Sequence, residues 1–236
     1  MMVRTKLAAA IMLAAAALLQ ACGGGGGSSA GTPVVGGDGA SGGSGSSGDA
    51  GSAISVSVGA SDQIVDGDTS ETYVQEFTVQ VVDSKGYPVA GATVTPTVTL
   101  PMYAKGYWGL NTDGAWARCG YPYANEDVNG NGSLDAGEDV DGDGKLAPRA
   151  ADVSVSYIDA KTTDANGQVK LRIQYLQSSA SWIQYALKAS AKVSTTEGVG
   201  SFSDWLGVPV DQLSDTTSAL PFQNSPYGAG LCGSSS

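Results

Sequence analysis

The sequence predicts an all-β fold, an antiparallel β-sandwich. Apolar and polar residues alternate with period two in several segments after Ile54, and no window keeps a helical period. Turn sequences separate these segments, among them DSKG at 83–86 and DANG at 164–167. Several short strands with such turns are typical of two packed antiparallel sheets. The alternating segments are 76–81, 92–100, 153–157, 169–175 and 183–192.

Residues 1–21 are predicted to be a signal peptide. Arg4 and Lys6 precede the apolar run LAAAIMLAAAALL, which is too short for a comfortable membrane span. The run leads into Leu-Gln-Ala-Cys at 19–22, which resembles the lipobox of bacterial lipoproteins. That resemblance implies that Cys22 is acylated and becomes the first mature residue, and Gly23 after it favours the outer membrane. An ordinary secretory signal cleaved near Ala21 is the alternative.

Residues 22–53 are predicted to be a tether. After the cysteine they are nearly all Gly, Ser and small polar residues, which cannot bury enough apolar surface to offset chain entropy. A flexible coil of this length has an r.m.s. span of roughly 30 Å. We therefore expect a lipid anchor to the membrane at one end and a folded domain, 54–236, held off the bilayer at the other.

Charge and composition exclude several functions. The net charge is −11, and removal of 1–21, with two basic and no acidic residues, makes it −13. This argues against a nucleic-acid partner or binding to an anionic membrane surface. The chain has no histidine, so Ser–His and Cys–His catalysis are closed, and its carboxylates concentrate in one metal-binding pattern. We expect a protein that is not an enzyme.

Two cysteines remain if Cys22 is lipidated. An even pair in an exported protein predicts a disulfide, here between Cys119 and Cys232. It would tie the C-terminal tail to the segment before the acidic stretch. Two free thiols are the alternative.

A family resemblance is carried by two of the strand-turn segments. VVDSKGYPVAGATVTPTV and TTDANGQVKLRIQY resemble the bacterial immunoglobulin-like domains of invasin and intimin, over about 74–98 and 162–193. The resemblance implies an immunoglobulin-like β-sandwich. Residues 101–150 depart from it, because those domains have short connections there. We expect this segment to be an insertion.

The acidic stretch NEDVNGNGSLDAGEDVDGDGKLAP, at 125–148, fits a calcium-loop template. The first loop matches D-x-[DN]-x-[DN]-G-x5-E throughout, with Gly132 at the sharp turn. Calcium takes six to eight oxygen ligands, and alternate residues of a curled loop supply them. The predicted ligands are Asp127, Asn129, Asn131, the carbonyl of Ser133, Asp135 and Glu138.

A second loop follows at once and lacks the final acid. Its predicted ligands are Asp139, Asp141, Asp143 and the carbonyl of Lys145, whereas Ala150 stands at position 12. This loop could borrow Asp135, Glu138 or Asp152, bind weakly, or complete the first. No helix separates the loops, so they resemble thrombospondin type 3 repeats more than an EF-hand pair. We expect one or two Ca²⁺ ions of weak affinity, about 10⁻⁴–10⁻³ M. A solvated acidic loop without an ion is the alternative.

The segment 103–123 is rich in aromatic residues. Tyr107, Trp108, Trp116 and Tyr121 could form a recognition surface, or the aromatic side chains could pack the metal loops onto the sandwich. The sequence thus predicts a non-catalytic, calcium-stabilised immunoglobulin-like domain of an outer-membrane lipoprotein. Adhesion or cell-surface assembly with an unknown protein or glycan partner is the expected role. A carbohydrate-binding module using 103–123 is the alternative.

Overall fold

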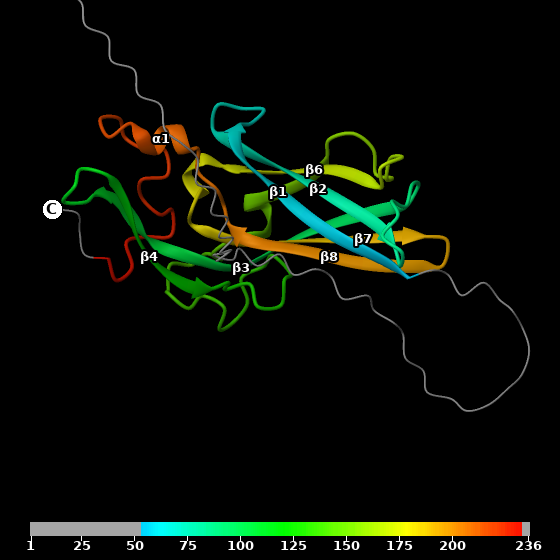
Figure 1. Ribbon diagram of the computed structural model, residues 1–236. Helices are drawn as coiled ribbons and strands as arrows, with labels where there is room; N and C mark the ends of the chain where they lie inside the picture. The colour runs from blue at the N-terminus through cyan, green and yellow to red at the C-terminus, as the bar shows by residue number, and fades with distance from the viewer. Residues whose placement is uncertain (1–52, 233–236) are drawn as a thin grey trace, which may run out of the picture.

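The computed structural model describes residues 53–232, and the predicted signal peptide, Cys22 and most of the tether lie outside them. Two four-stranded antiparallel sheets pack face to face, which confirms the predicted all-β sandwich (Figure 1). The first sheet has the order β1 (Ile54–Asp66), β2 (Thr72–Asp83), β6 (Gln168–Leu176), β5 (Val153–Tyr157). The second has the order β4 (Trp116–Ala124), β3 (Thr93–Leu110), β7 (Ile183–Val193), β8 (Thr196–Trp205).

Between residues 53 and 232, helical structure is confined to short turns. They are η1 (Ala150–Asp152), η2 (Gln177–Ser179) and α1 (Val210–Ser214). No helix in the described part of the chain is long and apolar enough to cross a membrane.

The strand order is that of an immunoglobulin-like sandwich. Across the first sheet, β1, β2, β6 and β5 take the places of strands A, B, E and D. In the second sheet, β4, β3, β7 and β8 take the places of C′, C, F and G.

The core lies between the sheets and follows the alternation read in the sequence. Phe77, on β2, is 1% exposed and meets the ring of Tyr185, on β7, edge to face at a centroid distance of 6.0 Å. Trp182, just before β7, is fully buried, and its indole N–H donates to the carbonyl of Phe222 at 2.8 Å. Buried aromatic groups thus connect both sheets and the C-terminal segment.

One side of the sandwich is closed by small residues. Strand β8 runs against β1, and a Cβ atom added at Gly200 would lie 2.5 Å from the carbonyl oxygen of Val56. At Gly198 the corresponding distance to the carbonyl oxygen of Ile54 is 2.9 Å. These two glycines therefore allow the edge strands of the two sheets to approach each other.

The expected insertion 101–150 contains two kinds of structure. Its first half is a β-hairpin, because β3 continues to Leu110 and β4 returns beside it with Met102 opposite Ala124. The turn is held by Asn111, whose N–H donates to the carbonyl of Ala115 at 2.9 Å. The irregular part is confined to residues 125–149.

Strands β1 and β8 were not among the five alternating segments that the sequence predicts as strands.

Replacement of Gly200 by alanine should separate β1 from β8. We expect Gly200→Ala to lower the free energy of unfolding by about 1–3 kcal/mol, because overpacking against backbone cannot be relieved by side-chain rotation. Gly59→Ala is the matched control, since the nearest atom to its added Cβ is the Thr78 carbonyl oxygen at 4.0 Å. Equal denaturation midpoints for the two variants would contradict the close contact.

Candidate metal centre

The two acidic loops occupy residues 127–138 and 139–150, and they begin at a fixed point. Asn125, at the end of β4, donates its side-chain amide to the carbonyl of Leu100 at 2.6 Å. Its backbone N–H donates to the carbonyl of Pro101 at 3.0 Å. The chain therefore leaves the hairpin at a defined place beside β3.

The first loop curls around its side-chain oxygens. Asp127 accepts the N–H groups of Asn131 and Gly132 on its two carboxylate oxygens, both at 3.0 Å. Asn129 Oδ1 also accepts from Asn131 N–H, at 2.9 Å, and Asn131 Oδ1 accepts from Ser133 N–H at 2.7 Å. Gly132 has φ +72°, which permits the sharp turn at position 6.

Glu138 ties the end of the first loop to its beginning. The side chain is buried, and its two oxygens accept the N–H groups of Val128 at 3.2 Å and Asp135 at 3.0 Å. Asp135 Oδ2 in turn accepts the amide groups of Asn129 and Asn131 at 2.9 and 2.8 Å. These two hydrogen bonds lower the pKa of Asp135.

The second loop repeats the pattern of the first. Asp139 accepts the N–H groups of Asp143 and Gly144, both at 3.0 Å. Asp141 Oδ1 accepts from Asp143 N–H at 3.1 Å, and Asp143 Oδ1 accepts from Lys145 N–H at 2.8 Å. The same four hydrogen bonds at loop positions 1, 3 and 5 show that the two halves of the repeat share one local structure.

Glu126 supplies the acid that the second loop lacks. Its Oε2 atom accepts from Ala147 N–H at 3.0 Å, and the nearby backbone of Val140 acts to lower the pKa of its carboxyl group. Val140 and Ala147 stand at positions 2 and 9 of the second loop. The N–H groups at positions 2 and 9 of the first loop bond in the same way to Glu138. Glu126 thus relates to the second loop as Glu138 relates to the first.

Glu126 also belongs to the one carboxylate triad within residues 53–232 that brings ligand atoms close together. Oxygen atoms of Glu126, Asp139 and Asp141 lie within 4.8 Å of one another. Asp135 and Glu138 remain with the first loop, and Asp152 is bound by Arg149 at 2.9 Å. The acids expected to complete the second loop are therefore engaged elsewhere.

Sequence reasoning missed Glu126 because the template starts one residue later. The signal was present in the 12-residue repeat, since Glu-Asp-Val opens it at 126–128 and again at 138–140. The glutamate before each aspartate is therefore part of the repeat.

The electrostatics of the second loop depend on the hairpin. Glu126 is 1% exposed, and burial, followed by the charge of Asp141, raises its pKa. Lys105, on β3, forms an ion pair with Asp141, and its hydrogen bond lowers the pKa of that carboxyl group. Tyr103 donates its hydroxyl to Glu126 Oε1 at 3.3 Å. The hairpin thus contacts two of the three clustered carboxylates.

Packing on this face involves tyrosines that are not in the predicted recognition set. The ring of Tyr103 stacks on Tyr123 at 5.6 Å and meets Tyr227 edge to face at 4.9 Å. Lys105 lies 5.3 Å from the centre of the Tyr123 ring. Aromatic residues therefore help to hold the second loop on the sandwich.

The four predicted recognition residues lie on two faces of the hairpin. The register places Tyr107 opposite Cys119 and Tyr121 opposite Lys105, so these two tyrosines share the face with Lys105. Trp108 and Trp116 project from the other face, because successive side chains of a strand alternate. The structure does not bring the four together as one surface.

Both tryptophans are engaged within the protein. The indole N–H of Trp108 donates to Ser181 Oγ at 3.0 Å, and its ring meets Phe222 edge to face at 5.9 Å. The indole N–H of Trp116 donates to the Asp215 carbonyl at 2.8 Å. Tyr121 is the exposed member, at 44%.

The predicted disulfide is present between Cys119 and Cys232, with 6.0 Å between the Cα atoms. The C-terminal segment lies along β3 on the side opposite β4. There Trp108 N–H donates to the carbonyl of Gln223 at 2.7 Å, and Gly106 N–H to that of Gly228 at 2.8 Å. The disulfide thus joins this segment to the far strand of the hairpin.

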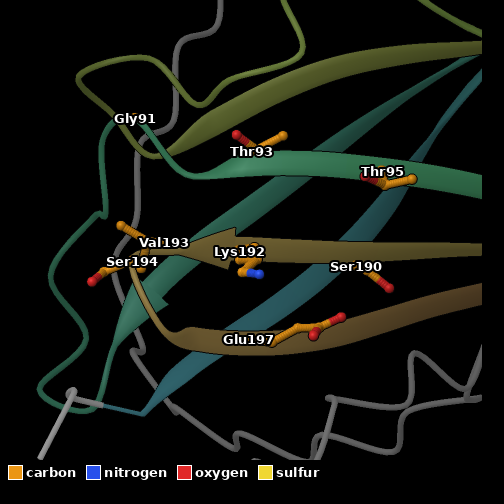
Figure 2. A pocket seen from close by; sticks show the side chains of 8 residues that line it. All are labelled: Gly91, Thr93, Thr95, Ser190, Lys192, Val193, Ser194 and Glu197. Atoms are coloured by element: carbon orange, nitrogen blue, oxygen red, sulfur yellow. The ribbon is translucent and has the colours of Figure 1, made fainter.

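A separate depression lies on the outer face of the second sheet, with a volume of about 430 Å³ (Figure 2). None of the predicted site residues lines it. It has no aromatic side chain for stacking on a sugar ring. Its lining residues are Gly91, Thr93, Thr95, Ser190, Lys192, Val193, Ser194 and Glu197.

Comparison with known proteins gives no information about the candidate site. No family model, curated protein or solved structure matches the chain. The immunoglobulin-like strand order therefore rests on the sheet topology of this protein and not on similarity to another protein.

We expect Glu126→Gln to weaken calcium binding at the second loop by more than about tenfold, because a hard cation binds a carboxylate better than an amide. Isothermal titration should show a loss of one binding step with the other kept. Glu76→Gln, at an exposed position on β2, is the control for the change in charge. Two unchanged steps in Glu126→Gln would contradict the role of this residue.

Proposed function

We propose that this chain is a calcium-stabilised, non-catalytic immunoglobulin-like domain that acts in adhesion or assembly at the bacterial cell surface. The observation that carries the proposal is the repetition of the same hydrogen bonds in two adjacent loops. A solvated acidic segment has no physical reason to repeat a local structure of this kind. A pair of ion sites has one, since each ion requires the same arrangement of oxygens.

The donor set fits calcium. All candidate side-chain ligands are carboxylate or amide oxygens, which suit a hard cation rather than zinc. Seven carboxylates fall within 126–143, and Lys105 is the cation in contact with them. Divalent ions would remove the repulsion between these like charges. In the proposed sites, the first loop uses Asp127, Asn129, Asn131, Ser133, Asp135 and Glu138, and the second uses Asp139, Asp141, Asp143, Lys145 and Glu126.

The surface role rests on the anchor proposed from the sequence. Acylated Cys22 would hold the chain in the outer membrane, and residues up to 53 would connect it to the domain. Strand β1 begins next to Gly198, close to the turn between β7 and β8, and the β3–β4 hairpin extends toward the opposite end (Figure 1). A tether at Cys22 would therefore leave the tip of the β3–β4 hairpin at the end far from the start of β1.

Calcium should raise the melting temperature of the protein. With a dissociation constant of about 10⁻⁴–10⁻³ M, 10 mM calcium adds about 1.4–2.7 kcal/mol, or roughly 3–10 °C. Differential scanning calorimetry after chelation and calcium addition measures the shift. We expect the double variant Asp127→Ala, Glu138→Ala to lose most of it.

The matched control is Asp62→Ala with Glu76→Ala, which removes two exposed carboxylates outside the loops. It should keep the calcium response. An unchanged melting temperature of the unaltered protein across this calcium range would rule out calcium stabilisation.

Lipid anchoring predicts that Cys22→Ala moves the protein from the membrane fraction to the soluble fraction. Intact-mass analysis of the unaltered protein should show an acylated N-terminal cysteine. A mature protein that begins near residue 22 without added acyl mass would instead support an ordinary secretory signal.

A further inference from the structure

The first half of β3 has an open edge. Val94 N–H donates to the carbonyl of Lys161 at 2.8 Å, and the Val94 carbonyl accepts the hydroxyl of Tyr157 at 2.7 Å. Both groups point away from β7. Because backbone groups alternate in direction along a strand, those of Pro96 and Val98 point to the same side. Within residues 53–232 the Val98 N–H and the carbonyls of Pro96 and Val98 have no partner there.

Strand β4 does not cover this stretch. It pairs with β3 only from Met102 onward, after a shift of register between Thr99 and Met102. Asn125 occupies the carbonyl of Leu100 and so ends the open stretch on that side. The edge is therefore bounded by Tyr157 at one end and by Asn125 at the other.

A groove with a volume of about 610 Å³ runs beside this edge. One wall is β3 from Val98 to Pro101, and the other consists of Ala124, Asn125, residues 127–130 and Ala150. The side chain of Val128 is 82% exposed and adds an apolar surface to the outer wall. Val98 carries unpaired backbone groups and also lines this partly apolar trough, so the two features meet at this residue.

We propose that this groove binds one extended segment of a partner protein, which adds as a strand beside β3. Strand addition satisfies the free backbone groups of Pro96 and Val98, and alternate side chains of the segment contact the trough. The inference goes beyond the proposed function, because strand addition and calcium binding are separate properties that can fail independently.

The segment is neutral or basic. The groove lining contains Asp127 and no lysine or arginine, and the remaining carboxylates of 126–143 follow it directly. A second copy of this chain fits poorly, because antiparallel pairing of two β3 edges would bring together two sets of seven carboxylates, which two Ca²⁺ ions per copy neutralise only in part. Pro96 would also leave each copy without one donor.

The test uses two acetylated and amidated heptapeptides, KVKVKVK and EVEVEVE, titrated into the isotope-labelled purified chain at constant calcium. We expect KVKVKVK to shift the amide signals of residues 97–100 and 124–130 and to give cross-strand contacts to Val98. EVEVEVE should produce no such change. Shifts confined to other surfaces, or equal binding of both peptides, would overturn the proposal.

Two substitutions separate strand addition from simple charge attraction. Val98→Pro removes the free N–H, whereas Val98→Ala removes the side chain and keeps the N–H. We expect Val98→Pro to weaken binding of KVKVKVK about tenfold and Val98→Ala to weaken it less than about threefold. Equal affinities for all three chains would show attachment by charge alone and overturn the proposal.

Two further measurements do not depend on the folding of these variants. In the unaltered chain, exchange of the Val98 amide hydrogen should be fast and should slow when KVKVKVK is added. Slow exchange without peptide would show that the edge is already covered. A concentration-dependent dimer in sedimentation that KVKVKVK dissociates would assign the edge to a second copy and would also overturn the proposal.

Peptide binding by the unaltered chain that persists after calcium is removed with a chelator would separate the two proposals. Calcium stabilisation without peptide binding would leave the proposed function standing and remove the strand-addition site.

Discussion

The irregularity in β3 between Thr99 and Met102 decides how the rest of the molecule is arranged. A strand directs its backbone groups alternately to two sides, so a shift of register changes which neighbour each group can reach. Before the shift, β3 pairs with β7 on one side and leaves the other side largely open. After it, β4 lies on that side, while β7 pairs only with Met102 and Tyr103 before the C-terminal segment takes its place at Tyr107. One strand therefore serves both the sandwich and the hairpin, and the acidic loops begin where the two meet.

The acidic loops show how a protein can hold carboxylates that repel one another. Backbone N–H groups donate hydrogen bonds to both carboxylate oxygens of Asp127 and of Asp139. Each loop therefore neutralises part of its own negative charge. Glu126 and Glu138 connect each loop to itself at positions 2 and 9. Glu126 precedes the first loop and bonds to the second, whereas Glu138 precedes the second loop and bonds to the first. The two loops therefore form one unit, because each is preceded by the glutamate that the other requires.

Much of the fold could be predicted from the sequence, since strands with one buried face have a clear period. The pattern fails where packing requires small residues. Strand β8 carries Gly198 and Gly200, which the contact with β1 demands, and these interrupt its alternation. In the hairpin, Gly106 and the aromatic residues around it conceal the strands, so the segment reads as a loop. Pairing, rather than propensity, makes it a strand.

The candidate site could be predicted in part. The curled form of both loops follows from spacing alone, because each position in the template has one geometric role, whereas calcium binding stays a prediction. Glu126 could not be found with a template that describes a single isolated loop, since its partners belong to the next repeat. The split of the aromatic set between two faces depends on the register of β3 and β4, which no local pattern specifies. The disulfide could be predicted because only Cys119 and Cys232 remain once Cys22 is assigned to lipidation.

The bond between Cys119 and Cys232 has a mechanical consequence. It closes a covalent ring with a sequence separation of 113 residues, which contains the whole acidic segment and strands β5 to β8. A steady pull on the domain from its amino-terminal side could draw out only the chain that precedes Cys119. However hard the load, the portion inside the ring has no free end to unravel, and the greatest length to which the molecule can be stretched is shortened accordingly.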